Sequence, residues 1–121
     1  MFLATTNKAR RLLHLSYIQN VTVAEVERGY EDLKLLLPEF PAGFRLLADL
    51  GRVQSVDLGC VEIIGRTMEL MDQHGLELVV RVVPDPSKDF AFKIIGIFHY
   101  PSQPRIISCE SMEEAAQALG L

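Results

Sequence analysis

The chain has 121 residues, of which 49% are hydrophobic and 23% are charged. This length is typical of one domain, so we expect residues 1–121 to form a single folded unit, and the composition is too apolar for intrinsic disorder. Sixteen acidic and twelve basic residues give a net charge of -4, which opposes sequence-independent binding to nucleic acid.

The apolar runs in the sequence bear on its cellular location. None of them reaches the roughly 20 residues that a membrane-spanning helix needs. The apolar start, Met1 to Ala4, is too short for a signal peptide, because the polar stretch Asn7 to Arg11 follows it. We therefore expect a cytoplasmic protein in which the two cysteines, Cys60 and Cys109, are reduced.

The first 40 residues predict a hairpin followed by a helix. Phe2 to Thr6 and Arg11 to Ile18 are the two strands, and the second alternates apolar and polar side chains with the period of a half-buried strand. Thr22 and Glu25 have the spacing of a capping box, so a helix is expected to begin there. Pro38 ends it.

The central stretch, Leu46 to Gly75, predicts a strand, a loop and an amphipathic helix. Phe44 to Leu50 is mostly apolar and short, which favours a buried strand, and Gly51 to Val56 is expected to be a loop. Gly75 follows the helix at the position where a left-handed residue ends many helices. The apolar stripe of this helix consists of Val61, Ile64, Met68 and Met71.

The C-terminal part predicts two further strands and one or two helices. Leu76 to Val83 is rich in β-branched residues and fits a core strand, and Arg105 to Ser108 is a short strand. Phe90 to Tyr100 is ambiguous, because its apolar residues exceed one helical stripe. Ser111 and Glu114 form a second possible capping box before a last helix. Strands alternating with about four helices predict an α/β fold with a mostly parallel, mixed sheet and an N-terminal hairpin.

The order of these elements resembles that of STAS domains, the family shared by sulfate transporters and anti-sigma factor antagonists. The matching points are Leu47 to Leu50, Asp57 and Gly75. The chain is more closely similar to uncharacterised bacterial STAS-like proteins, through Val21-Thr22 before the first helix and Cys109 to Ser111 before the last. The resemblance implies a single STAS-like domain, and it implies no established activity.

The sequence departs from this family at the start of the central helix. Phosphorylated members carry Asp-Ser-Ser/Thr-Gly there, where the helix N-terminus stabilises the new negative charge. This chain has Asp57, Leu58, Gly59 and Cys60, which offer no hydroxyl. We therefore predict no phosphorylation switch in this loop. Ser55 is a possible acceptor in a shifted register, although an ordinary loop serine is the simpler interpretation.

Two side chains of this loop suggest roles that differ from phosphorylation. Asp57 is interpreted as the N-cap of the helix, a role that contributes about 1 kcal/mol, with a ligand or partner contact as the alternative. Cys60 is interpreted as a small buried thiol, with a nucleophile or redox sensor as the alternative. A nucleophile needs a nearby base, and the sequence places no histidine beside Cys60.

The sequence contains no pattern that is typical of a catalytic or metal site. Its histidines and cysteines lack metal-ligand spacing, and it has no glycine-rich phosphate loop and no nucleophile elbow. We therefore expect a protein that is not an enzyme and that binds no cofactor or metal.

Two hypotheses for the function follow. The first is a non-catalytic regulatory module of STAS-like type that contacts a protein partner, or a second copy of itself, through the loop and helix start at Asp57, Leu58, Gly59 and Cys60. The second is a small-molecule or lipid binding protein with an apolar cavity or surface, because contiguous exposed apolar residues mark binding sites. The residues proposed for that surface are Phe90, Phe92, Ile95, Phe98 and Tyr100.

Overall fold

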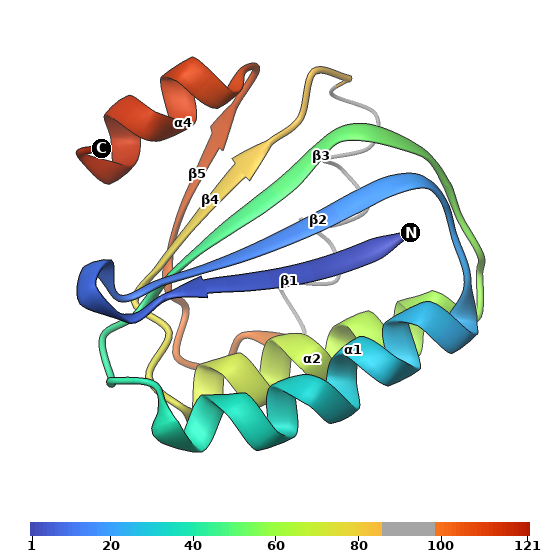
Figure 1. Cartoon of the computed structure of the whole chain (residues 1–121), viewed down its shortest axis with the longest axis horizontal. Helices are drawn as coiled ribbons and strands as arrows, with labels where there is room; N and C mark the ends of the chain where they lie inside the picture. Colours follow the sequence, from blue (N-terminus) through green and yellow to red (C-terminus); the bar gives the residue numbers. More distant parts are fainter. Residues whose placement is uncertain (86–98) are drawn as a thin grey trace.

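A five-stranded sheet with the strand order β1-β2-β3-β4-β5 forms the centre of the molecule (Figure 1). The structure is a computed structural model that describes residues 1–85 and 99–121. β1 pairs antiparallel with β2, and all the other neighbouring strands pair parallel. The predicted mixed, mostly parallel sheet with an N-terminal hairpin is confirmed. The strands are β1 (Phe2–Asn7), β2 (Leu12–Val21), β3 (Arg45–Val56), β4 (Leu78–Val82) and β5 (Arg105–Cys109).

The helices lie on both faces of this sheet (Figure 1). In the described ranges these are α1 (Val23–Leu36), α2 (Cys60–Gln73) and α4 (Met112–Leu119). α1 and α2 pack side by side on one face, and α4 packs on the other face against β4 and β5. Short 3-10 helices, η1 (Lys8–Arg10) and η2 (Leu37–Glu39), follow β1 and α1.

The strand residues divide between two hydrophobic clusters, one on each face of the sheet. On β2, Leu13, Leu15 and Tyr17 point into the larger cluster, which α1 and α2 cover. Leu12 and Val80 belong to the smaller cluster beneath α4. Full burial of a large apolar side chain stabilises a fold by roughly 1.5–3 kcal/mol. The period-two alternation of β2 therefore determines which residues of that strand face α1 and α2.

β3 is longer than the sequence pattern predicts. The predicted loop from Gly51 to Val56 is wrong, because these residues continue the strand to Val56. They pair in parallel with the end of β2, where Ile18 aligns with Arg52 and Val21 with Val56. Backbone pairing with a neighbouring strand thus extends β3 through a sequence that has little apolar character. The pairing contains two register shifts, which allow the polar half of β3 to follow β2.

The two predicted capping boxes have different outcomes. At α1 the box is complete, because the Glu25 N–H donates to Thr22 Oγ1 at 3.4 Å and the Thr22 N–H donates to Glu25 Oε1 at 3.1 Å. At α4 the Glu114 N–H donates to Ser111 Oγ at 3.2 Å, but Glu114 Oε2 accepts from the Glu110 N–H at 3.3 Å. The second box is therefore only half formed.

The predicted end of α2 at Gly75 is confirmed. Gly75 has a φ of +93°, in the left-handed region that favours glycine, and it follows the C-cap residue His74. The Gly43 N–H donates to the Gly75 carbonyl at 2.9 Å. A Cβ on Gly75 would lie 3.1 Å from the Cβ of Ala42, so the loop before β3 packs tightly on the end of α2.

Candidate interaction site

The 57–60 loop, Asp57 to Cys60, joins the end of β3 to the start of α2. β2 and β3 are parallel and end together, since Val21 aligns with Val56 in the register. The helices that follow these strands, α1 and α2, therefore begin at the same end of the sheet (Figure 1). Loops at the carboxyl ends of parallel strands are common places for binding sites.

The end of β2 holds the 57–60 loop in place through one backbone carbonyl. The Val21 carbonyl accepts the Asp57 N–H at 3.1 Å, and the Cys60 thiol donates to the same oxygen at 3.7 Å. Next to this carbonyl, the Ser55 hydroxyl donates to Asn20 Oδ1 at 2.6 Å. The only phosphate acceptor near the loop that the sequence suggested, Ser55, thus has its hydroxyl bonded to the adjacent strand.

Gly59 brings the 57–60 loop into contact with the start of α1. A Cβ at Gly59 would lie 2.8 Å from Cγ2 of Val23, closer than real Cβ contacts. Gly59 has an ordinary φ of -62°, so the close approach to Val23, rather than backbone strain, favours glycine here. The loop and the first turn of α1 therefore form one continuous surface.

The predicted N-cap role of Asp57 is wrong. Gly59 occupies the N-cap position of α2, and among the residues that the structure describes no side chain caps this helix. The Cys60 N–H donates to the Asp57 carbonyl at 2.9 Å, and the Val61 N–H donates to the Leu58 carbonyl at 3.2 Å. Backbone carbonyls of the turn thus accept the N–H groups that a capping carboxylate would bind, and the Asp57 side chain is exposed.

Cys60 lies inside the protein, with none of its surface exposed. Burial raises the pKa of its thiol, and the Asp57 carboxylate raises it further. A reactive cysteine needs the opposite shift, since the thiolate is the nucleophile. This environment favours the interpretation of Cys60 as a core residue. Within the described ranges, no cluster of His, Cys, Asp and Glu side chains is arranged to hold a metal ion.

Leu58 is the most exposed apolar side chain of this region, with 91% of its surface accessible. Val61, one turn further along, is also exposed. The acidic side chains Asp57 and Glu62 are exposed next to them. We call the exposed side chains of Asp57, Leu58, Val61 and Glu62 the α2-start surface. An apolar centre with an acidic rim is suited to a protein partner.

The predicted apolar surface falls largely on residues that the structure does not describe. Phe90, Phe92, Ile95 and Phe98 lie outside the described ranges, so a binding surface there stays a prediction. Tyr100 is buried and lines a cavity of about 20 Å³. That volume has room for about one water molecule. Tyr17 and Arg81 also line this cavity.

Sequence reasoning missed the residues that support the loop from β2 and α1, namely Asn20, Val21 and Val23. The Val21-Thr22 pair signals only the start of α1 in the sequence. The contact of Val21 with the 57–60 loop, more than 30 residues later, follows from the parallel pairing of β2 and β3. No sequence pattern predicts a contact between residues so far apart in the chain.

Comparison with known proteins gives a fold but no sequence relative. No protein-family model matches the chain, and no curated protein sequence matches it. Solved structures do match. The anti-sigma factor antagonist SpoIIAA in its unphosphorylated form superposes with a TM-score of 0.65 at 14% identity, over 100% of both chains.

Two further structures agree with this match. An uncharacterised Shewanella loihica protein with a SpoIIAA-like fold gives a TM-score of 0.69 at 15% identity, over 98% of this chain and 92% of its own. An anti-sigma factor antagonist from Mycobacterium paratuberculosis gives a TM-score of 0.59 at 12% identity, over 100% and 94%. The fold is STAS-like. At these identities the likeness concerns the STAS-like fold alone. No helix of the described ranges is long and apolar enough to cross a membrane.

Proposed function

We propose that the chain, as one STAS-like domain, is a non-catalytic regulatory module of the cytoplasm that binds a protein partner through the α2-start surface. The observation that carries this proposal is Leu58, which is 91% exposed on a loop held by backbone bonds. Exposing a large apolar side chain on a well-held turn is typical of a recognition residue. The solved structures of similar fold include proteins described as anti-sigma factor antagonists, which supports a regulatory role.

The second part of the proposal is that phosphorylation does not switch this surface. SpoIIAA is described in an unphosphorylated and in a phosphorylated form. In this chain the 57–60 loop carries no hydroxyl, and two N–H groups at the start of α2 already donate to the Asp57 and Leu58 carbonyls. Those N–H groups are the ones that would stabilise a phosphate. A constitutive contact surface fits these residues better than a switched one.

A pair of surface variants tests the partner contact. Leu58→Asp places a charge at the centre of the α2-start surface, and Leu35→Asp makes the same change near the opposite end of α1, where Leu35 is 80% exposed. A protein captured from the source cell by the wild-type chain is identified, purified and titrated against all three proteins. We expect Leu58→Asp to weaken binding at least tenfold, or about 1.4 kcal/mol, and Leu35→Asp to leave it unchanged.

Either of two results would reject this surface as the site. In the first, the Leu58→Asp variant binds the partner as tightly as the wild-type chain does. In the second, Leu58→Asp and Leu35→Asp weaken binding equally. Phosphorylation is tested separately, by intact mass and by peptide mass mapping after incubation with ATP and an extract of the source cell. We expect no added phosphate between residues 55 and 60. A phosphate on Ser55 would instead support the shifted acceptor.

A further inference from the structure

Among residues 1–85 and 99–121, β1 pairs only with β2, so its other edge is open with respect to these residues. The Met1 ammonium donates to the Ile18 carbonyl at 2.6 Å, and the Ile18 N–H donates back to the Met1 carbonyl at 2.8 Å. Backbone groups in an antiparallel pair alternate in direction along the strand. Because Met1 and Ile18 exchange both backbone hydrogen bonds, the backbone groups of Leu3 and Thr5 also point toward β2. The N–H and C=O groups of Phe2, Ala4 and Thr6 consequently point away from the sheet.

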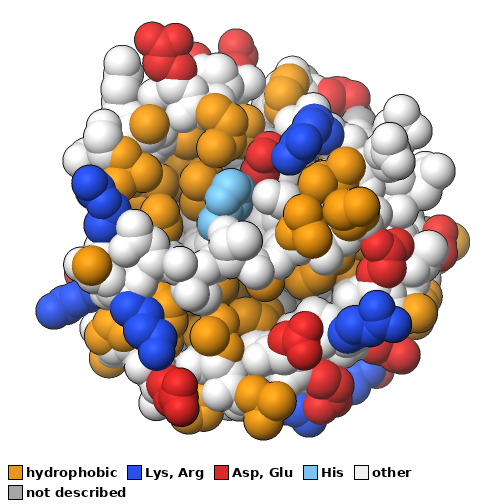
Figure 2. Space-filling model, viewed as in Figure 1, with side chains coloured by type: hydrophobic (Ala, Val, Ile, Leu, Met, Phe, Trp, Pro, Cys, Tyr) orange, Lys and Arg blue, Asp and Glu red, His pale blue; other side chains and the backbone are white. Residues whose placement is uncertain are grey.

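In the part of the chain that the structure describes, this open edge lacks three of the features by which proteins block edge pairing, namely charged side chains, proline and a bulge. β1 reads FLATTN and contains no charged side chain and no proline. Its register with β2 is continuous from Phe2 to Asn7, without a bulge. Figure 2 shows this side of the molecule, where hydrophobic side chains lie around a histidine and white atoms, which are backbone and other side chains. An unblocked strand edge of this kind is suited to binding another strand.

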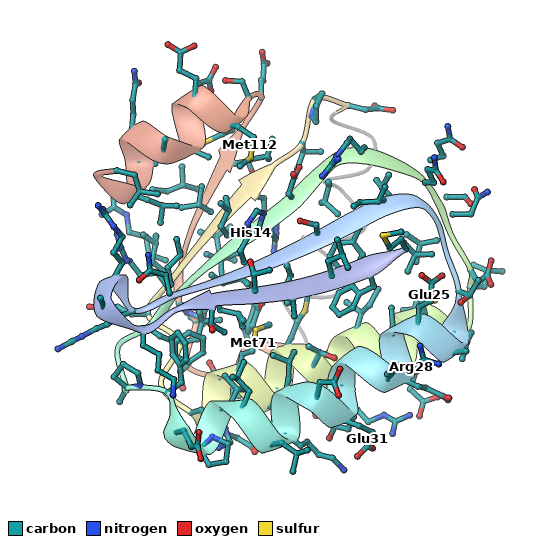
Figure 3. All side chains as sticks on the ribbon, viewed as in Figure 1. His14, Glu25, Arg28, Glu31, Met71 and Met112 are labelled. Atoms are coloured by element: carbon teal, nitrogen blue, oxygen red, sulfur yellow. The ribbon has the colours of Figure 1, made fainter. Side chains whose placement is uncertain are left out.

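A groove runs along the open edge between β1 and α1. It has a volume of about 610 Å³. Phe2, Leu33 and Leu36 give it apolar walls, while Glu25 and Arg28 line it from α1, below the N-terminal end of β1 (Figure 3). The Phe2 ring packs on Tyr17 with 5.0 Å between ring centroids and occupies the space that a Cβ at Gly29 would need, so β1 lies close to α1 here. The groove therefore borders the free backbone groups directly.

We propose that β1 pairs antiparallel with β1 of a second copy of this chain, about a twofold axis at Ala4. In this register Ala4 faces Ala4 of the second copy, and Phe2 faces Thr6. All three residues with outward backbone groups then find partners, which gives about six hydrogen bonds between the copies. A twofold contact is the commonest symmetry of protein dimers, and here the same three residues serve both sides.

Side-chain directions agree with this register. Paired residues of antiparallel strands project on the same face of the sheet. Phe2, Ala4 and Thr6 of the second copy would thus project on the α1 side, where Phe2 stays packed on Tyr17 of its own chain and Ala4 and Thr6 border the groove. Leu3 and Thr5 project on the other face, which they share with His14 of β2 (Figure 3). The groove thus receives small or apolar side chains and no charge.

Replacement of Ala4 by proline tests the pairing. The Ala4 N–H points away from β2, so Ala4→Pro removes a bond between copies without removing one inside the chain. Light scattering of the whole chain is expected to give twice the monomer mass for the wild type and the monomer mass for Ala4→Pro. Thr5→Val, which keeps the backbone donor and changes a side chain on the other face, is the matched control and should remain dimeric.

Hydrogen exchange distinguishes lost pairing from a lost strand. In the wild-type dimer, the amides of Phe2, Ala4 and Thr6 should exchange slowly, as should those of Leu3 and Thr5. In Ala4→Pro, Phe2 and Thr6 should exchange at least tenfold faster, while Leu3 and Thr5 stay protected by β2. A monomeric wild type, a dimeric Ala4→Pro variant, or fast exchange at Phe2 and Thr6 in the dimer would overturn the proposal. Loss of partner binding in Leu58→Asp would leave the dimer intact, so the two proposals fail independently.

Discussion

The Cys60 thiol lies against the backbone carbonyl of Val21, with 3.7 Å between the sulfur and the oxygen. The contact joins the first turn of α2 to the last residue of β2, and it places the thiol in the core rather than on the surface. Asp57 shares the same carbonyl through its N–H. The position of Cys60 in the sequence alone would assign it to a contact loop. In the structure its buried side chain instead packs beneath that loop.

We predict that both thiols are unreactive in the folded protein. Cys60 and Cys109 are free and buried, and burial raises the pKa of each thiol, so the thiolate is scarce at neutral pH. A coloured disulfide reagent at pH 7.5 should label each thiol at least tenfold more slowly in the native chain than in the denatured chain. Fast labelling of Cys60, located by peptide mass, would revive the redox or nucleophile hypothesis.

We predict that stability falls steeply in alkali. Burial raises the pKa of both Tyr17 and Tyr100 well above the ordinary value near 10. The folded state thus favours the neutral phenols. The two neutral phenols contribute fully to the stability of the fold below the pKa of tyrosine in the unfolded chain. This stabilisation is lost as the pH rises from that pKa through the raised pKa values of the folded state. Each such tyrosine should lower the free energy of unfolding by roughly 1.4 kcal/mol per pH unit above pH 10.

Chemical denaturation at several pH values measures this effect. Tyr100→Phe keeps the ring but removes the ionising group, so it should show a shallower loss between pH 10 and pH 11 than the wild type. Tyr30→Phe is the matched control, because Tyr30 is only partly buried beside α2. Identical slopes in the wild type and Tyr100→Phe would contradict the assignment to Tyr100.

We predict that Thr22→Ala destabilises the fold by about 1 kcal/mol at neutral pH. The threonine hydroxyl accepts the Glu25 N–H and completes the capping box of α1. Urea unfolding measures the change. Thr5→Ala, on the exposed edge strand, is the control and should stay within about 0.5 kcal/mol of the wild type. A Thr22→Ala variant as stable as this control would show that the box contributes little.

We predict that Gly65→Ala disturbs the contact between α2 and His99. A Cβ at Gly65 would lie 2.7 Å from His99 Nε2, while His99 Nδ1 is 2.7 Å from Glu69 Oε1. The alanine must displace the ring and weaken this pair, at a net cost of about 1–3 kcal/mol. Urea unfolding gives the value, and Glu62→Ala on the exposed side of α2 is the control.

A double-mutant cycle makes the Gly65 prediction specific. In a His99→Ala background the clash is absent, so Gly65→Ala should cost little there and can even stabilise the helix by up to about 1 kcal/mol. Equal costs of Gly65→Ala in the two backgrounds would show that His99 is not the cause.

Local patterns predicted much of the fold. The period-two alternation of β2, the capping residues Thr22 and Glu25, and Gly75 after α2 each depend on interactions within a few residues, so they are readable from the chain. The extension of β3 to Val56 was not predictable in this way. It depends on hydrogen bonds with β2, whose residues lie more than 30 positions earlier.

The candidate site shows the same division. The sequence by itself determined that Asp57 to Cys60 contain no hydroxyl and stand between a strand and a helix, because these are properties of residue type and local order. Only the tertiary structure decided that Leu58 is exposed, that Cys60 is buried beneath it, and that Gly59 rather than Asp57 begins the helix. Exposure and capping depend on where the Val21 carbonyl and the Val23 side chain lie, and parallel pairing of β2 with β3 brings those atoms to the loop.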